Sequence, residues 1–551
     1  MNGAQALMRT LVDGGVEVCF SNPGTSEMHF VAALDDEPKM RAVLALFEGV
    51  ATGAADGYAR IAGKPAATLL HLGPGLGNGL ANLHNARKGK VPVVNIVGDH
   101  AGYHAQYDAQ LQSDIETVAR NVSPWLRRSE TTADVARDTA EAVAASQGPP
   151  GQVATLILPA DASWGDGGQP AAPVTPPAPP VASADVIDGV ARAVRAGERT
   201  AILLGGRALR EPGLVAAANV AAATGVKLYA ETFPTRIERG AGLPTIERIA
   251  YLAELASVQL TGLDHLVLVD AKAPVSFFAY PGKKSYLVPD GCTVHELASP
   301  SDDAIGSLDA LVEKIGAGGA GPALQPLARP ERPTGELTAD KVCQAVGAVL
   351  PENAIISDES QTSGVTLAAQ TAGAPRHDVL TLTGGSIGQG LPVAVGAAIA
   401  APDRPVLALE ADGSAMYTIQ ALWTAAREQL DITTVILNNS SYSILNIELQ
   451  RVGVQGGPGE KAKSQLDLAG PDLDFVALGQ GMGVPSVRVE TCEQLIAELE
   501  RAFAEPGPHL IECGVPSVYS GLRLKAMPYA LRALGSLPTP VARAIKRKMY
   551  P

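Results

Sequence analysis

Two segments near the end of the chain carry residue types that bind a hard cation together with phosphates. The first, Asp412-Gly413-Ser414, directly follows the apolar run 406–410, and the second, Asn438-Asn439-Ser440-Ser441, follows the apolar run 432–437. Short apolar runs of this kind are typical of buried strands in a parallel sheet, and residues 419–428 between them have a helical pattern. A strand–helix–strand unit brings both segments to the carboxyl edge of one sheet, where ligands bind.

The residue types at this edge favour Mg²⁺. This ion takes about six oxygen ligands, of which one or two usually come from the protein and the rest from phosphate and water. Asp412 would supply a charged oxygen, Asn439 an amide oxygen and Ser441 a main-chain carbonyl oxygen. Gly413 and Ser414 would open a helix whose first N–H groups can hold a diphosphate. A turn aspartate is common without any ligand, but its pairing with the asparagines of a second strand favours a metal site.

The same stretch resembles the signature of the thiamine diphosphate-dependent decarboxylase and acetolactate synthase superfamily. That signature is Asp-Gly-Ser, then about one strand–helix–strand unit, then Asn-Asn. The sequence from Asp412 to Ala426 is most similar to benzoylformate decarboxylase. The family usually has glycine before the aspartate, where this chain has Ala411, whose methyl group could crowd the diphosphate. The resemblance covers most of the chain and implies thiamine diphosphate and Mg²⁺ as cofactors.

Glu48 is a candidate activator of that cofactor. It lies between apolar segments, 44–47 and 49–51, where a bare carboxylate is costly and a protonated or proton-sharing carboxyl is favoured. The alternative is a solvent-facing glutamate at a helix start, which would also suit the helix dipole. The Phe-Glu-Gly context matches the family's activating glutamate. The resemblance therefore implies that Glu48 exchanges a proton with the pyrimidine ring of thiamine diphosphate.

Two further residues of the N-terminal third are candidate catalytic groups. His71 follows the apolar run 66–70 and precedes a glycine-rich segment, 72–78, that we expect to be a loop. Histidine suits general acid–base work, although a single histidine at a strand end is more often structural. The resemblance to benzoylformate decarboxylase implies that His71 is an active-site histidine and that Thr25 stands where that enzyme has an active-site serine.

One expected histidine is missing. Benzoylformate decarboxylase has a second active-site histidine in its middle domain, near the segment that corresponds to 274–281, where this chain has none. Phe277 or Phe278 would make this pocket more apolar. His100 and His104 could compensate, because they fall where pyruvate decarboxylases carry a histidine pair, although exposed loop histidines are the alternative.

The segment 384–390 has the glycines of a tight turn before a helix. By resemblance, Ile387 is the bulky apolar residue on which the cofactor bends, and the carbonyl of Gly385 holds its amino group. With Glu48, Asn439 and Ser441, and with Gly413 and Ser414 at the diphosphate, these residues complete the expected cofactor site.

Composition argues against several classes of partner. The net charge of −14 disfavours nucleic acid and anionic membranes. No apolar run reaches the roughly 20 residues of a membrane span, and residues 1–6 lack the pattern of a signal peptide. The five cysteines are scattered without metal spacing, as in a reducing cytoplasm. We therefore expect a cytoplasmic protein that acts on a small molecule.

Length and pattern predict the fold class. The 551 residues fit three domains of typical size, and apolar runs alternate with helical segments, which predicts an α/β fold with three doubly wound parallel-sheet domains. A proline-rich stretch (170–180) and a glycine- and proline-rich stretch (316–333) read as linkers. By resemblance the parts are a pyrimidine-binding domain (1–168), a Rossmann-like middle domain (183–325), a diphosphate- and Mg-binding domain (335–525) and a C-terminal tail (526–551).

The resemblance implies an enzyme that decarboxylates a 2-oxo acid without oxidation, through an enamine intermediate, as benzoylformate decarboxylase does. Acetolactate synthase-type ligation of two 2-oxo acids remains an alternative, and so does a non-catalytic subunit with this fold. FAD in the middle domain is possible, but Gly205-Gly206 alone does not indicate a nucleotide. In this family the first domain of one subunit faces the last domain of its neighbour, so we expect a homodimer or homotetramer with sites at subunit interfaces.

Overall fold

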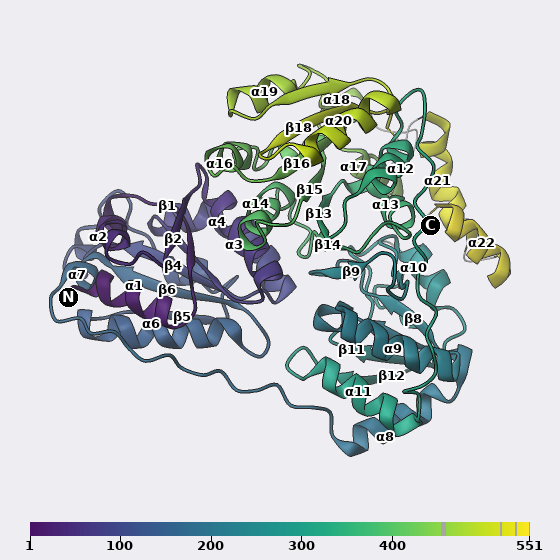
Figure 1. The fold of residues 1–551 in the computed structure, drawn as a ribbon, viewed down its shortest axis with the longest axis horizontal. Helices are drawn as coiled ribbons and strands as arrows, with labels where there is room; N and C mark the ends of the chain where they lie inside the picture. Colours follow the sequence, from purple (N-terminus) through teal and green to yellow (C-terminus); the bar gives the residue numbers. More distant parts are fainter. Residues whose placement is uncertain (281, 453–458, 518–520, 535–536, 550–551) are drawn as a thin grey trace.

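The computed structural model of the chain describes all residues except 281, 453–458, 518–520, 535–536 and 550–551. Three α/β units follow one another along the chain, each built on a sheet whose strands are mainly parallel (Figure 1). Each unit, a sheet with its helices, is called a layer below: the first, the middle and the last or C-terminal layer. The predicted fold class, three parallel-sheet α/β domains, is therefore confirmed. The domain boundaries stay a prediction. The proline-rich stretch 170–180 has no regular secondary structure and runs between the first and second layers, as expected of a linker.

The N-terminal sheet has the strand order β2-β1-β3-β4-β6-β5, and all its pairs are parallel. Its strands are almost fully apolar because helices cover both faces. The strands are β1 (Val18–Asn22), β2 (Arg41–Leu44), β3 (Ala66–Leu70), β4 (Val93–Asp99), β5 (Trp125–Arg128) and β6 (Val153–Pro159). The helices are α1 (Gly3–Asp13), α2 (Met28–Ala33), α3 (Glu48–Ala62), α4 (Leu72–Gly89), α5 (Ile115–Ala119), α6 (Thr132–Gln147) and α7 (Ala160–Trp164).

The middle sheet has the order β10-β8-β7-β11-β12 and is also parallel. Its chain passes from β7 outward to β8 and then returns to the other side of β7, so the direction of winding switches between β7 and β11. The strands are β7 (Thr200–Leu204), β8 (Lys227–Ala230), β10 (Glu247–Arg248), β11 (His265–Val269) and β12 (Thr293–Ala298). The helices are α8 (Ala184–Val194), α9 (Glu211–Thr224), α10 (Ala253–Leu260) and α11 (Ala304–Ile315).

The C-terminal sheet has the order β17-β18-β16-β15-β13-β14-β9. Its edge strand β9 (Ile237–Arg239) comes from the middle part of the chain and pairs antiparallel with β14, which the sequence did not predict. The other strands are β13 (Ala354–Glu359), β14 (His377–Thr381), β15 (Val406–Ala411), β16 (Ile432–Asn438), β17 (Ser486–Val489) and β18 (His509–Gly514). The helices of this part are α12 (Ala339–Val349), α13 (Leu367–Gln370), α14 (Gly390–Ala400), α15 (Asp412–Ala415), α16 (Ala421–Arg427), α17 (Ser443–Arg451), α18 (Glu460–Ser464), α19 (Phe475–Gly481), α20 (Cys492–Ala504), α21 (Gly521–Leu534) and α22 (Thr539–Met549).

Helices α3 and α14 pack against each other and join the first layer to the last (Figure 1). Their backbones approach so closely that a Cβ atom on Gly57 would lie 2.1 Å from the carbonyl oxygen of Val393, and one on Gly396 would lie 1.9 Å from that of Ala54. Larger residues at either glycine would push the helices apart. One continuous apolar core therefore spans the two layers.

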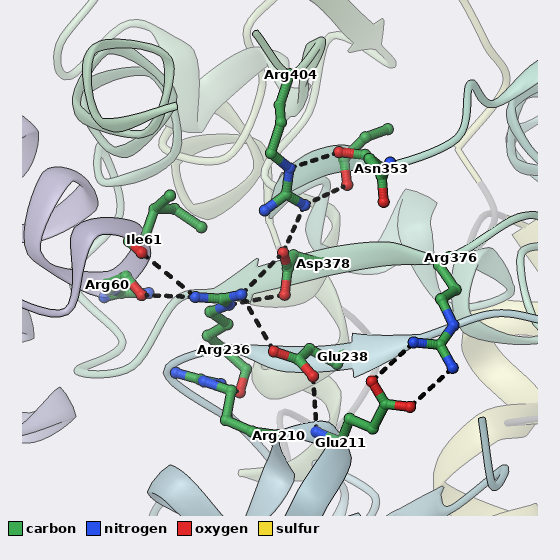
Figure 2. A network of polar contacts seen from close by, with 11 residues as sticks. Arg60, Ile61, Arg210, Glu211, Arg236, Glu238, Asn353, Arg376, Asp378 and Arg404 are labelled. Carbon is green, nitrogen blue, oxygen red and sulfur yellow. Dashed lines mark hydrogen bonds and ion pairs between the residues drawn. The ribbon is translucent and has the colours of Figure 1, made fainter. Parts of the chain in front are cut away.

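A network of arginines and carboxylates ties all three layers together (Figure 2). Arg236, beside β9, donates to Asp378 of β14 (Nε–Oδ1 2.7 Å) and pairs with Glu238 (3.1 Å). It also donates to the main-chain oxygen of Arg60 at the end of α3 (3.4 Å). Arg60 in turn donates to the carbonyl of Thr381 (2.8 Å). Glu211 of α9 donates its N–H to Glu238 (2.6 Å), so the network also holds the middle layer.

The glycine-rich segment 72–78, predicted to be a loop, instead forms the first two turns of α4, so that prediction was wrong. Two of its three glycines serve close packing rather than turning. A Cβ on Gly73 would lie 1.9 Å from the Ser113 hydroxyl oxygen, and one on Gly75 would lie 3.2 Å from Glu48 Oε1. In the described part of the chain, no helix is long and apolar enough to cross a membrane.

Candidate functional site

The candidate metal site lies at the carboxyl ends of β15 and β16, which are adjacent parallel strands. Asp412 follows β15 directly, and its Oδ1 accepts from the N–H of Gly413 (2.8 Å) while its Oδ2 accepts from the N–H of Asn439 (3.0 Å). The Asn439 side-chain oxygen accepts from the N–H of Ser441 (3.0 Å). The residue between them, Ser440, has φ +52°, so the chain turns back toward Asp412. The structure thus brings the three predicted ligand residues together.

The residues at this edge fit a divalent cation. Asp412 is 1% exposed, and burial raises the pKa of its carboxyl, against backbone hydrogen bonds from Gly413 and the 439–441 turn that lower it. Its carboxylate accepts from backbone N–H groups, and no side-chain cation of the described residues pairs with it. Carboxylate, amide and main-chain oxygens are the donors that Mg²⁺ prefers, and the main-chain oxygen of Ser441 already accepts from the N–H of Ser443 (2.8 Å). Gly413 and the buried Ser414 lie in the short helix α15 that begins there.

A cavity of about 420 Å³ opens beside this edge, between the middle and C-terminal layers. Gly385 and Ile387, predicted to contact the cofactor, both line it. Gly385 has φ +76°, a conformation that other residues rarely adopt, and a Cβ there would lie 2.4 Å from the ring of Phe277. Tyr442 also lines the cavity and packs against Gly413, where a Cβ would lie 2.3 Å from the tyrosine ring. Gly385 and Ile387 therefore border the cavity directly, whereas Gly413 is separated from it by the Tyr442 ring.

One wall of the cavity is aromatic. Phe277 stacks edge-on to Phe233 (ring centroids 5.7 Å apart) and Phe278 (5.0 Å), and its ring is tilted against Tyr251 (5.3 Å). Leu252, at the entry to α10, and other aliphatic side chains continue the wall. The segment that lacks the expected histidine therefore contributes an apolar surface to the cavity.

Two buried carboxyls lie next to the segment 384–390, which borders the cavity, and sequence reasoning missed them. Glu359, at the end of β13, accepts from the N–H groups of Gly388 (2.8 Å) and Gly390 (2.6 Å). Glu410 lies opposite it on β15, in register. Burial raises the pKa of both carboxyls, that of Glu359 to about 7. Two glutamates at the ends of neighbouring apolar runs were the available signal.

Glu48 is the first residue of α3 and is 9% exposed, so it is not the solvent-facing glutamate of the alternative interpretation. Asn78 of α4 donates to its Oε2 (3.0 Å). Gly75 leaves room for the carboxyl, since a Cβ there would lie 3.2 Å from its Oε1. The helix that was expected to be a loop thus orients this carboxyl.

His71 lies after β3, at the same sheet edge, and its Nδ1 is 2.7 Å from Oε2 of Glu27. Glu27 was missed by sequence reasoning, although an acid two residues beyond Thr25 in the loop after β1 was a visible signal. Thr25 itself begins this short turn and is exposed. His100 directly follows β4, and its ring is 5.2 Å from that of His104. The first layer therefore gathers its candidate groups at one edge.

Within one chain, these two groups of residues do not share the cavity. Among the described residues, the cavity is lined only by positions from 232 onward, so Glu48, His71 and Thr25 are not part of its wall. Large apolar side chains are exposed at the first layer's edge (Leu46, Tyr103, Tyr107) and around the cavity mouth (Phe278, Tyr417). Exposed apolar patches near a site mark surfaces that bind another protein or a ligand.

The middle layer does not fit FAD or another dinucleotide. In such sheets the phosphates bind at the switch point, here after β7 and β11. The N–H of Gly206 donates to Glu231 (2.9 Å) and the N–H of Arg207 donates to Asp270 (2.8 Å), so the chain's own carboxylates take the phosphate donors. Lys90 of the first layer pairs with Asp270 (3.1 Å). To bind at this switch point, a phosphate would have to displace the carboxylates of Glu231 and Asp270.

Comparisons with known proteins identify the family. Residues 1–119 match the family described as thiamine pyrophosphate enzyme, N-terminal TPP binding domain, and residues 361–513 match its C-terminal TPP binding domain. The chain is 61% identical to the Mycobacterium tuberculosis protein called "Putative acetolactate synthase large subunit IlvX", over 94% of this chain and 100% of that one. It is 29% identical to benzoylformate decarboxylase of Pseudomonas aeruginosa, over 90% and 96%.

A solved structure shows the same fold. The thiamine diphosphate-dependent 4-hydroxybenzoylformate decarboxylase of Rhodococcus jostii RHA1 superposes with a TM-score of 0.80 at 24% identity, over 94% of this chain and 100% of that one.

Proposed function

The chain belongs to the thiamine pyrophosphate enzymes, of decarboxylase and acetolactate synthase type, and we propose that it is a Mg²⁺-dependent 2-oxo acid decarboxylase similar to benzoylformate decarboxylase. The observation that carries this proposal is the aromatic wall of Phe233, Tyr251 and Phe277 beside Gly385 and Ile387. An apolar wall next to the expected cofactor position suits a 2-oxo acid with a bulky apolar side chain.

The chain's own residues would hold the cofactor and move protons. Asp412, Asn439 and Ser441 would hold Mg²⁺, and the N–H groups of α15 would contact the diphosphate. When bound, thiamine diphosphate supplies an electron sink for the bond between the carboxylate and the ketone carbon. Glu48, fixed by Asn78, would hold or release a proton at its carboxyl, and His71 would transfer a proton to or from the substrate oxygen.

We also propose that two copies of the chain complete each site. The cavity is bordered by the middle and C-terminal layers, while Glu48 and His71 lie at the edge of the first. Exposed apolar side chains at both places, such as Leu46 and Tyr417, would be covered by such an arrangement. A homodimer or homotetramer with the first layer of one copy over the cavity of another satisfies both observations.

Acetolactate synthase-type ligation is the second candidate, because the 61% identical relative carries that name. In that reaction a second 2-oxo acid, rather than a proton, takes up the electrons left after CO₂ departs. A non-catalytic subunit is less well supported, since Glu48, Asp412 and Asn439 are all present and positioned.

One experiment separates these candidates. The holoenzyme, with thiamine diphosphate and Mg²⁺, is incubated with benzoylformate and, separately, with pyruvate, and the products are identified by mass. Benzaldehyde from benzoylformate supports the decarboxylase. Acetolactate from pyruvate without benzaldehyde would favour the ligase, and no consumption of either acid, with cofactor binding verified, would contradict a catalytic role on these substrates.

A further inference from the structure

We propose that Glu27 is a positioning residue that holds His71 in one tautomer and one orientation for proton transfer. This inference rests on the proposed role of His71 and adds a residue that the resemblance did not assign. The Oε2 atom of Glu27 lies 2.7 Å from His71 Nδ1 and also accepts from the N–H of Gly24 (2.7 Å). The same oxygen thus links the turn after β1 to the residue after β3.

The surroundings of this pair leave it little freedom. The Glu27 side chain is 1% exposed, whereas the His71 ring is 23% exposed, so one partner is fixed inside and the other reaches the sheet edge. Two glycines make the arrangement possible. A Cβ on Gly24 would lie 2.2 Å from His71 Nδ1, and a Cβ on Gly98 would lie 1.7 Å from Glu27 Oε1. A larger residue at either place would displace the pair.

The chemistry requires a definite tautomer. A neutral imidazole has one N–H donor and one acceptor nitrogen, and a carboxylate at Nδ1 selects the form with the proton on Nδ1. Nε2 is then the atom free to accept a substrate proton, and the carboxylate stabilises the cation that results. The same logic of base and orienting acid operates in hydrolase triads. Glu27 therefore acts through His71 without touching substrate.

Other ionisable groups lie near the pair of Glu27 and His71. Burial raises the pKa of the Glu27 carboxyl, while the Gly24 N–H and His71 act to lower it. Glu48 lies across Gly75 from His71, since a Cβ on Gly75 would be 3.2 Å from Glu48 Oε1 and 3.4 Å from His71 Cβ. Asp99 follows Gly98 at the end of β4, and His100 comes directly after the strand. The test must therefore report on His71 itself.

The direct test is the ¹⁵N NMR spectrum of His71 in the full-length protein, with Glu27→Gln compared with wild type. We expect the wild-type ring to be mainly in the Nδ1–H form and the ring in the Glu27→Gln variant to show a mixture, because an amide can donate as well as accept. Glu17→Gln, an exposed change at the start of the same sheet, is the matched control and should leave the His71 signals unchanged. An unchanged tautomer in Glu27→Gln would overturn the proposal, and this readout needs no substrate.

A double-mutant cycle then tests the route of action. Glu27→Gln should lower kcat about 10- to 100-fold with a smaller change in KM, and should cost less than about twofold in a His71→Ala background. An equal loss in both backgrounds would mean that Glu27 acts independently of His71. If Glu27→Gln does not fold, Glu27→Asp, which keeps the carboxylate, replaces it. The Glu27→Asp variant should keep the Nδ1–H form, and a mixed tautomer there would count against the carboxylate's role.

Discussion

At the scale of single residues, the proposed chemistry depends most on one carboxyl. Glu48 is buried at the start of α3 and is held by Asn78 of α4, so it can exchange a proton without rearranging its neighbours. Glu48→Gln should fold and bind thiamine diphosphate, but slow hydrogen–deuterium exchange at the cofactor's C2 carbon by about 100-fold or more. NMR of the quenched cofactor measures this rate. Wild-type exchange in the variant would place the proton relay elsewhere.

The metal assignment makes a separate prediction for Asp412. Removing its carboxylate with Asp412→Ala should weaken Mg²⁺-dependent retention of thiamine diphosphate by about 100-fold or more, because the diphosphate would face an incomplete metal shell. Calorimetry with and without Mg²⁺ measures the affinity. Asp403→Ala, an exposed change in the turn before β15, is the matched control. Equal cofactor affinity in Asp412→Ala and wild type would remove Asp412 from the site.

The sequence indicated most of these residues, for a physical reason. Asp412 and Asn439 each follow a buried apolar strand, and neighbouring parallel strands end at one edge, so their meeting could be predicted without coordinates. Glu27 could not be singled out in the same way. Its partner His71 is 44 residues away, and only the pairing of β1 with β3 brings them together.

At the scale of elements, strands were easier to predict than the helices and edges around them. The apolar runs at 66–70, 406–410 and 432–437 are strands whose bounds agree with the expected ones to within one residue. The glycines of 72–78 were misleading, because glycine is as useful for close helix packing as for turns. Strand β9 was missed because three residues carry no periodic signal, and its partner β14 lies about 140 positions further along the chain.

The start of strand β14 gives a pH-dependent prediction. Burial lowers the pKa of His377 from 6.5 to about 4, against the hydrogen bond to the carbonyl of Pro375 that raises it. The unfolded chain therefore binds a proton that the folded chain does not, so stability from this residue is present above pH 6.5 and is lost as the pH falls toward 4. The full shift corresponds to about 3 kcal/mol.

His377→Asn, whose amide can still donate to the Pro375 carbonyl, should therefore lose less stability than wild type between about pH 7 and pH 5. Thermal unfolding across this range measures the difference. A His377→Asn variant that is as acid-sensitive as wild type would assign the acid loss to other groups.

At the scale of the whole molecule, the proposed site residues of one chain fall into two separate groups. The Arg236 network and the α3–α14 contact fix the three layers relative to one another (Figures 1 and 2). Large hinge motion that would bring Glu48 to the chain's own cavity is therefore opposed by many buried contacts. A second copy is the simpler source of the missing half. Sequence alone pointed to this only through the family resemblance, because composition and periodicity carry no information on which chain completes a site.

Mixing two inactive variants tests the shared site most directly. Glu48→Gln subunits keep the metal site, and Asp412→Ala subunits keep the glutamate, so a hybrid dimer regains one site in which both halves are intact. After equal amounts are mixed under conditions shown by mass spectrometry to exchange subunits, decarboxylation of a 2-oxo acid that the wild type accepts should recover to about a quarter of wild-type activity. If exchange is complete and no activity returns, the site is built within a single chain and the proposed assembly is wrong.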